Sequence, residues 1–279
     1  MSYDAQELSI QSGAPVEIYT FTRDVVSWHY TSSETDYTDA TVSPSVVYTS
    51  SPLTRDAVAS TPEKAKNTVK LEVPRDFPVA DLFRTSPPTE VINLTVRRVH
   101  RGDPTDIITI WIGRVLSCEF SGPKATLSCE PITVSLERTG LRRVYQVACP
   151  HVLYGGQCGL AKATYAHSTT IAALSGNDLT VATNDSAFSY GGGFIEWVND
   201  DGITDRRFIE SAALNANSPQ LLVLTLLQPF TGVSVSDNVT IYPGCDHTLS
   251  TCNSQFSNAA NYGGMPFFPS KNPFTVSVF

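Results

Sequence analysis

The chain has 279 residues and a formal net charge of −8 at pH 7, so its surface as a whole does not favour nucleic acid and we expect no sequence-specific nucleic-acid contact. Charged residues make up only 16% of the chain, which argues against long helices with solvated charged faces. At roughly 150 residues per domain, the length indicates two domains.

Targeting and membrane segments are not expected. The first residues, Met1-Ser-Tyr-Asp-Ala-Gln-Glu-Leu, lack the basic and apolar regions of a signal peptide. The most apolar run, Leu221–Leu227, is too short to cross a bilayer, so we expect no membrane insertion. We therefore expect synthesis in a reducing cytosol, where thiols stay free or bind metal more often than they form disulfides.

Residues 1–144 are predicted to form an N-terminal β domain. Val69, Leu71 and Val73 alternate with polar residues, which is typical of a half-buried strand. Further strands are expected at residues 16–21, 25–30, 46–48, 92–96, 107–120, 125–129 and 132–136, with loops over much of 31–66 and one or two helical turns after Asp76.

Two cysteines fall on this predicted meander. If the turn at residues 122–123 is symmetric, Cys118 faces Cys129 across the hairpin. Both would then lie on the face that carries Leu116, Phe120 and Leu127. We interpret the two thiols as small buried hydrophobic side chains, with a disulfide or a ligand role as the alternative.

Residues 161–242 are predicted to form a small β-barrel-like module, with a sandwich as the alternative. Strands are expected at residues 169–172, 178–182, 194–198, 207–211, 220–227 and 238–242, with a strong turn signal at Asp200-Asp-Gly. Residues 243–279 hold little regular structure beyond one short helix near Cys252. The aromatic residues of this tail are expected to dock on the protein itself or on a neighbour; they are Phe267, Phe268, Phe274 and Phe279. The whole chain is thus predicted to be mostly β, with antiparallel strands in two modules.

Two pairs of cysteines flank the predicted barrel. Cys149 and Cys158 lie in a first cysteine loop, residues 145–160, and Cys245 and Cys252 lie near the C-terminus. Both pairs sit beside Gly or Pro in a loop-like setting, as expected for ligands that converge on one group. Four thiolates suit zinc or an iron–sulfur cluster.

The number of residues between the two cysteines of each pair helps to distinguish zinc from a larger cluster. Zinc fingers and ribbons place paired cysteines about two to four residues apart, whereas these pairs span wider loops that could surround a larger group. Nearby glycines would let backbone N–H groups approach the sulfur atoms; these are Gly155, Gly156, Gly159 and Gly244. From the residues alone, two disulfides and four unrelated thiols stay open as alternatives.

The sequence gives only weak signals for a catalytic site or for histidine ligands. Gln157-Cys158-Gly159 with downstream His247 and Asn261 resembles a cysteine-protease set, but the residues after Gly159 depart from the papain-type pattern. His151 and His247 each lie two residues from a cysteine and could act as substitute ligands, although ordinary loop histidines are the simpler interpretation. The sequence has no phosphate loop, dinucleotide fingerprint, zinc-protease motif or nucleophile elbow.

The run Cys149-Pro-His-Val-Leu-Tyr-Gly-Gly-Gln-Cys-Gly-Leu carries a family resemblance. It resembles the tail-tip hub proteins of long-tailed, non-contractile bacteriophages and the related hub of gene transfer agents. The resemblance extends to Trp28-His-Tyr-Thr-Ser, Ile110-Trp-Ile-Gly-Arg-Val, Cys129-Glu-Pro and Pro243-Gly-Cys-Asp-His, and is weakest between residues 165 and 240.

The resemblance implies a structural virion protein without catalytic activity, assembled in the host cytoplasm and located at the tail tip. It implies a homotrimer that links the tail tube and distal tail protein to a central fibre or tip protein, with the tape measure protein as a further partner. It also implies an iron–sulfur cluster, expected to be of the four-iron four-sulfur type, held by Cys149, Cys158, Cys245 and Cys252. An iron–sulfur or zinc enzyme is the alternative function, and zinc the alternative metal.

Overall fold

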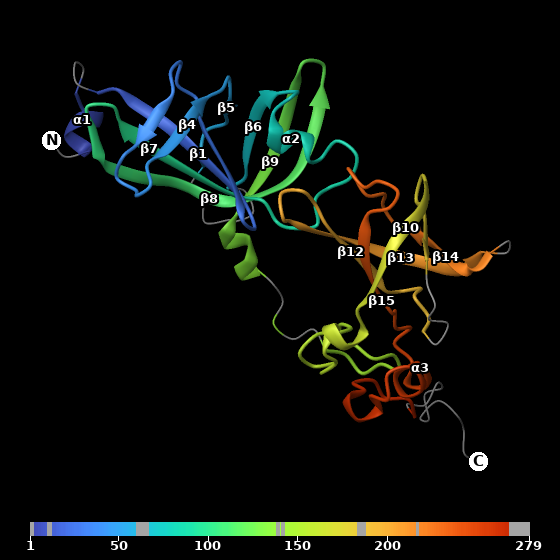
Figure 1. Ribbon diagram of the computed structural model, residues 1–279. Helices are drawn as coiled ribbons and strands as arrows, with labels where there is room; N and C mark the ends of the chain where they lie inside the picture. The colour runs from blue at the N-terminus through green and yellow to red at the C-terminus, as the bar shows by residue number, and fades with distance from the viewer. Residues whose placement is uncertain are drawn as a thin grey trace, which may run out of the picture. The chain divides into compact units, whose positions relative to one another are not determined.

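A computed structural model describes residues 3–9, 13–59, 67–137, 140, 143–182, 188–215 and 218–267 (Figure 1). The chain forms two compact units. The first comprises Met1–Arg138 with Asp200–Ile203, and the second comprises Thr139–Asn199 with Thr204–Phe279. Both units consist mainly of antiparallel strands, which confirms the predicted mostly-β fold class. No helix in the described part of the chain is long and apolar enough to cross a membrane.

The first unit is built on a nine-stranded sheet in the order β3-β4-β2-β1-β7-β8-β9-β6-β5. A short helix, α1 (Tyr3–Glu7), precedes the sheet, and α2 (Pro78–Asp81) covers part of it near β9. The strands are β1 (Pro15–Arg23), β2 (Val26–Thr31), β3 (Tyr37–Asp39), β4 (Val46–Ser50), β5 (Thr54–Arg55), β6 (Val69–Pro74), β7 (Asn93–His100), β8 (Asp103–Ser121) and β9 (Lys124–Pro131).

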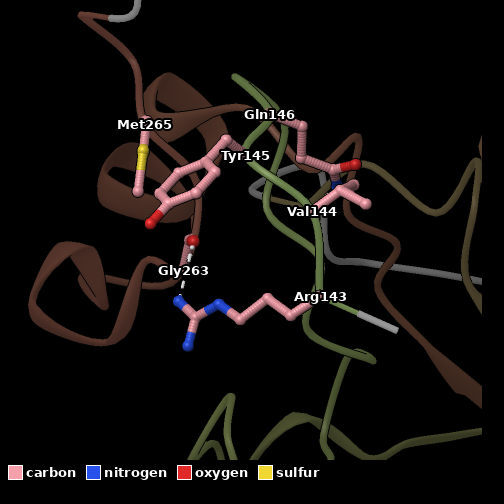
Figure 2. Close-up of a pocket in the computed structure, with 6 residues that line it drawn as sticks. All are labelled: Arg143, Val144, Tyr145, Gln146, Gly263 and Met265. Atoms are coloured by element: carbon pink, nitrogen blue, oxygen red, sulfur yellow. Dashed lines mark hydrogen bonds between the residues drawn. The ribbon is translucent and has the colours of Figure 1, made fainter. Parts of the chain in front are cut away.

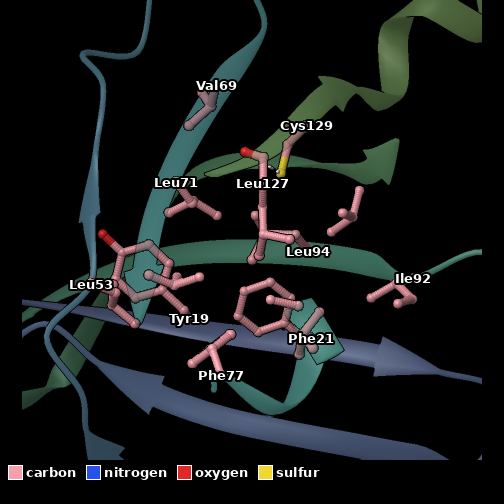
Figure 3. Close-up of a cluster of buried hydrophobic side chains, with 14 of the residues drawn as sticks. Tyr19, Phe21, Leu53, Val69, Leu71, Phe77, Ile92, Leu94, Leu127 and Cys129 are labelled. Carbon is pink, nitrogen blue, oxygen red and sulfur yellow. Dashed lines mark hydrogen bonds between the residues drawn. The ribbon is translucent and has the colours of Figure 1, made fainter. Parts of the chain in front are cut away.

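Among its described residues, the first unit has two separate clusters of buried apolar residues, and one of them includes the alternating residues of β6. Val69, Leu71 and Val73 of β6 are buried while the residues between them are exposed, as the alternation predicted. They pack with Leu94 of β7 and Leu127 of β9 in a single apolar cluster (Figure 3). Burial of this apolar area is the main force that holds the sheet and α2 together.

The prediction of a strand at residues 132–136 is wrong, because Ile132–Glu137 forms a 3-10 helix. Ile132 and Leu136 are 63% and 69% exposed, so neither face of this segment is buried against a core. The Ser135 hydroxyl donates to the Ile132 carbonyl at 2.8 Å, a local bond that favours a turn over an extended chain. An alternating apolar pattern alone does not make a strand without a partner strand beside it.

The expected pairing of Cys118 with Cys129 is also wrong. The two-residue turn pairs Cys118 with Leu127, and an irregularity between Val115 and Ser117 places Val115 opposite Cys129. The extra residue also turns Leu116 outward, where it is 49% exposed. Cys129 is buried in the apolar cluster (Figure 3). Cys118 packs against the same cluster, so both act as small apolar side chains.

The second unit contains a closed six-stranded barrel in the order β10-β11-β14-β13-β12-β15. This closure confirms the predicted barrel-like module. The strands are β10 (His167–Ser175), β11 (Asp178–Ala182), β12 (Phe194–Val198), β13 (Thr204–Asn215), β14 (Ser218–Leu226) and β15 (Asn238–Tyr242). Side chains such as Ile195, Ile209 and Leu224 fill its interior, as expected for a small barrel.

The cysteine loops lie at the two ends of the barrel segment in the chain. A 3-10 helix, Lys162–Tyr165, joins the first loop to β10. After β15 the chain forms α3 (Leu249–Ser254) and a 3-10 helix, Ala259–Asn261. In the tail, Phe267 is 93% exposed, while Phe268, Phe274 and Phe279 lie outside the described residues.

Candidate metal centre

All four cysteines flanking the barrel line one cavity in the second unit. Cys149 and Cys158 come from the first cysteine loop, and Cys245 and Cys252 come from the segment after β15. The cavity has a volume of about 20 Å³, which is room for about one water molecule. Among the described residues, no three His, Cys, Asp or Glu side chains gather closely enough to hold a single metal ion.

The first cysteine loop is shaped by short backbone bonds and by residues with positive φ. Gly155 N donates to the Val152 carbonyl at 2.9 Å, and Gly159 N donates to the Gly155 carbonyl at 3.0 Å. Gly159 has a φ of +73°, and a Cβ there would approach the Asn261 side-chain nitrogen at 3.1 Å. Glycine therefore suits this position both by conformation and by space.

Tyr154 anchors the same loop on the barrel. Its ring contacts Phe194 of β12 and Tyr242 of β15, with centroid distances of 6.0 and 6.2 Å. After the loop, Lys162 donates to both carboxylate oxygens of Glu196 on β12, at 2.8 and 2.9 Å. The loop that carries Cys149 and Cys158 is thus held on the barrel on both sides of Cys158.

The second cysteine loop is ordered by the cap of α3. The Thr248 hydroxyl accepts a hydrogen bond from Thr251 N at 3.2 Å, which caps the helix that carries Cys252. Asp246 accepts from the Thr248 N–H and hydroxyl, both at 2.9 Å. Burial pushes the pKa of Asp246 upward, but these hydrogen bonds hold that pKa below its ordinary value.

Direct hydrogen bonds join the two loops. Cys149 N donates to the His247 carbonyl at 2.9 Å, and the Tyr262 hydroxyl donates to the Val147 carbonyl at 2.6 Å. The two cysteine pairs are far apart in sequence but belong to one hydrogen-bonded structure.

Three of the four sulfur atoms have an N–H group beside them. His247 N lies 3.3 Å from Cys245 Sγ, and Gly263 N lies 3.4 Å from Cys149 Sγ. The Asn258 side-chain amide lies 3.8 Å from Cys158 Sγ. Such donors stabilise a thiolate, so they suit sulfur atoms that bind a cation.

The Cys252 thiol instead donates to the Asn258 carbonyl at 3.3 Å. Burial raises the pKa of the Cys252 thiol, and the neighbouring thiols of Cys245, Cys149 and Cys158 raise it further. Burial likewise raises the pKa of Cys245, against the opposing hydrogen bond from His247. Crowded thiols of this kind resist ionisation unless a cation compensates their charge.

The two candidate histidines also line the cavity. A ring nitrogen of His151 lies 3.1 Å from the Asn261 carbonyl oxygen. The Asn261 side-chain amide points to Asn258, to which it donates at 2.7 Å. Asn261 thus orients another asparagine, which differs from the histidine–asparagine contact that a cysteine-protease set requires.

The sequence interpretation missed the residues after α3 that surround the sulfur atoms. Asn258, Asn261 and Tyr262 form hydrogen bonds to the first cysteine loop or to one another there. A Cβ at Gly264 would lie against the Val147 carbonyl, so the two backbones approach closely. The run Asn261-Tyr-Gly-Gly was a local signal for such an approach, but nothing in it indicates the partner.

A second hollow, of about 350 Å³, lies beside the start of the first cysteine loop. Figure 2 shows Arg143 on one segment of the chain and Gly263 and Met265 on another. The Arg143 guanidinium donates to the Gly263 carbonyl at 3.1 Å, and Met265 N donates to the Gln146 carbonyl at 2.9 Å. The C-terminal segment is therefore bonded along the first loop from Gln146 to Cys149.

The second unit matches a phage-related family model. The family described as "Phage conserved hypothetical protein BR0599" matches residues 188–272, which include Cys245 and Cys252. An uncharacterized protein of Xylella fastidiosa (strain 9a5c) is 27% identical over 183 residues. That alignment covers 61% of this chain and 37% of the Xylella protein, so the chain spans little more than a third of the length of this relative.

The whole fold is similar to a chain from the virion of a native gene transfer agent particle. The TM-score is 0.77, and the match covers 99% of this chain and 95% of that chain at 19% identity. The two chains therefore share a fold over nearly their full lengths. This agrees with the phage-related resemblance seen in the sequence.

Proposed function

We propose that this chain is a structural virion protein, the hub of a phage tail tip, without catalytic activity. The observation that carries the proposal is the match over 99% of the chain to a gene transfer agent virion chain. The phage-conserved family model over residues 188–272 supports it independently. In this role the chain forms a trimer that joins the tail tube and distal tail protein to the central fibre or tip protein.

The proposed centre is an iron–sulfur cluster held by Cys149, Cys158, Cys245 and Cys252. The donor set fits, because four thiols line one cavity and N–H groups lie beside three of the sulfur atoms. When bound, a cluster supplies four metal–thiolate bonds that cross-link the two loops. The cavity of about 20 Å³ is smaller than such a group, so loading requires the loops to shift apart.

The chain's own residues would position the loops for this role. Tyr154 and Lys162 hold the first loop on the barrel, and the α3 cap orders the second. Because the cluster's binding energy then counts as folding energy, its loss is expected to loosen both loops and leave the two β cores folded.

The test compares Cys158→Ser with Cys118→Ser, both purified without oxygen. We expect iron and sulfide in the native protein and in Cys118→Ser, and neither in Cys158→Ser. Cys158→Ser should also be cleaved faster near residues 150–162 and 243–256 and should fail to assemble tail tips. A Cys158→Ser protein with full iron and sulfide would contradict the ligand assignment, and bound zinc without sulfide would favour a zinc site.

Assembly is tested separately. A reconstruction of the tail tip should locate three copies of this chain in one ring. Six copies in the ring, or no copy in purified virions, would refute the hub proposal, and turnover of a substrate by the loaded protein would favour the enzyme alternative.

A further inference from the structure

Asn258 follows α3 in the chain and contacts one cysteine of each pair. The residue is 9% exposed although its side chain is polar. A buried amide has to form hydrogen bonds to offset its loss of water, and those bonds identify what it positions.

The side chain of Asn258 contacts the first cysteine pair. Its amide nitrogen donates to the Cys158 carbonyl at 2.7 Å and lies 3.8 Å from Cys158 Sγ. The same group therefore fixes the backbone of Cys158 and places an N–H beside its sulfur atom.

The backbone of Asn258 contacts the second pair. Asn258 N donates to the Cys252 carbonyl at 2.9 Å, and the Asn258 carbonyl accepts from the Cys252 thiol at 3.3 Å. One residue thus contacts a cysteine of each pair, through its side chain for one and its main chain for the other.

The Cys158 carbonyl and Asn261 together define the orientation of this amide. The side-chain nitrogen of Asn261 donates to Asn258 Oδ1 at 2.7 Å, so the oxygen of Asn258 is engaged and its nitrogen faces Cys158. An amide that could flip would present either a donor or an acceptor to the sulfur. The Cys158 carbonyl can only accept, so its bond of 2.7 Å requires the amide nitrogen of Asn258 on this side and excludes the acceptor arrangement.

We propose that Asn258 is the positioning residue of the four-cysteine centre, holding Cys158 through its side-chain amide and Cys252 through the bond from Asn258 N to the Cys252 carbonyl. The bond that the Cys252 thiol donates to the Asn258 carbonyl is lost when this thiol gives up its proton to bind a metal. Asn258 orients two ligands from different loops and supplies an N–H donor that stabilises charge on Cys158 Sγ. The inference rests on the proposed centre and extends it, because it assigns a residue that controls how firmly the metal is held and at what potential it is reduced.

The test replaces the amide with a carboxylate of the same shape, Asn258→Asp. This variant keeps the acceptor for Asn261 and the backbone contacts with Cys252, but it removes the donor to Cys158. Asn253→Asp is the matched control, since it adds the same charge at an exposed position on α3. Asn258→Leu removes the donor without adding charge, and remains informative if the aspartate variant does not fold.

Two properties of the full chain, purified without oxygen, are measured: the midpoint potential of the centre and its rate of iron loss to a chelator. We expect both Asn258 variants to have a more negative midpoint potential and about 10- to 100-fold weaker iron retention than the native chain. Asn253→Asp should match the native chain in both. A purely packing role would leave the potential unchanged in variants that still load iron.

The outcomes separate the two proposals. Native protein without iron and sulfide would refute the centre itself. Native protein that loads a cluster, with unchanged potential and iron retention in both Asn258 variants, would overturn the role of Asn258 alone. The same shift in Asn253→Asp as in Asn258→Asp, with no shift in Asn258→Leu, would also overturn it, because added charge would then be the cause.

Discussion

The hydroxyl of Tyr154 donates a hydrogen bond of 3.0 Å to the carbonyl oxygen of Pro243. Tyr154 lies between Cys149 and Cys158 in the chain, and Pro243 lies two residues before Cys245. Burial raises the pKa of Tyr154, and the nearby Tyr165, Cys158 and Cys245 side chains raise it further, so the phenol stays protonated and keeps donating.

Tyr154→Phe removes this bond while keeping the ring contacts with the barrel. We expect the second unit to lose about 0.5–1.5 kcal/mol of unfolding free energy, because the Pro243 carbonyl loses a partner at a half-buried position. Hydrogen exchange should quicken in residues 243–249 and in the first cysteine loop. Tyr145→Phe, at a tyrosine that is 79% exposed, is the control and should change neither measurement.

Gly264→Ala tests the close approach between the tail and the first cysteine loop. An added Cβ would meet the Val147 carbonyl and the backbone of Ala148, neither of which can turn aside as a side chain could. We expect a loss of about 1–3 kcal/mol and faster proteolysis at residues 143–152. Gly156→Ala is the control, because a Cβ there has nothing within 4 Å, and equal cleavage of the two variants would show that the approach is not required.

Strands were predictable where apolar and polar residues alternate along a segment. One such strand is β6, in which Val69, Leu71 and Val73 are buried. The same kind of pattern at Ile132–Glu137 gave a 3-10 helix, because pairing with another strand depends on distant residues that a local pattern does not report. The irregularity between Val115 and Ser117 was equally hidden, and it changed which residue faces Cys129.

The cysteines of the candidate centre were predictable from the local sequence, but the residue that contacts both pairs was not. The spacing of the cysteines and the glycines around them indicated loops that converge, and the four thiols do line one cavity. Asn258 could not be found this way, because its contact with Cys158 joins residues that are 100 positions apart. Nothing in the local sequence distinguishes it from Asn253 or Asn261.

Replacing both Cys118 and Cys129 with Ala should leave iron binding intact. Cys129 is 1% exposed, and burial raises its pKa to about 12, so its thiol stays protonated and acts as an apolar group. We expect a loss of about 1 kcal/mol per site from the space left in the core. Loss of iron and sulfide in this double variant would mean that one of these thiols is a ligand.

Acid should destabilise the first unit through the protonation of Glu17. Glu17 on β1 accepts hydrogen bonds of 2.8 Å from Arg55 Nε and from an Arg98 guanidinium nitrogen, and its side chain is 17% exposed. Burial alone would raise the pKa of Glu17, but the bonds from Arg55 and Arg98 outweigh it and hold the pKa below its ordinary value. A carboxyl group with a lower pKa in the folded chain stabilises the fold above its unfolded pKa, and this contribution is lost as the pH falls through the folded value.

The unfolding free energy of the native chain should therefore fall as the pH drops below about 4.5, and in Glu17→Gln this part of the fall should be missing. Glu17→Gln should also be less stable than the native chain at neutral pH, because a neutral amide removes the counter-charge of Arg55, whose side chain is 13% exposed, and leaves Arg98 with Glu7 as its acidic partner. Glu119→Gln, at an exposed position on β8, should reproduce the native pH profile. Denaturant unfolding followed at several pH values measures all three, and a Glu17→Gln profile parallel to the native one down to acid pH would show that this carboxylate does not govern the acid stability of the first unit.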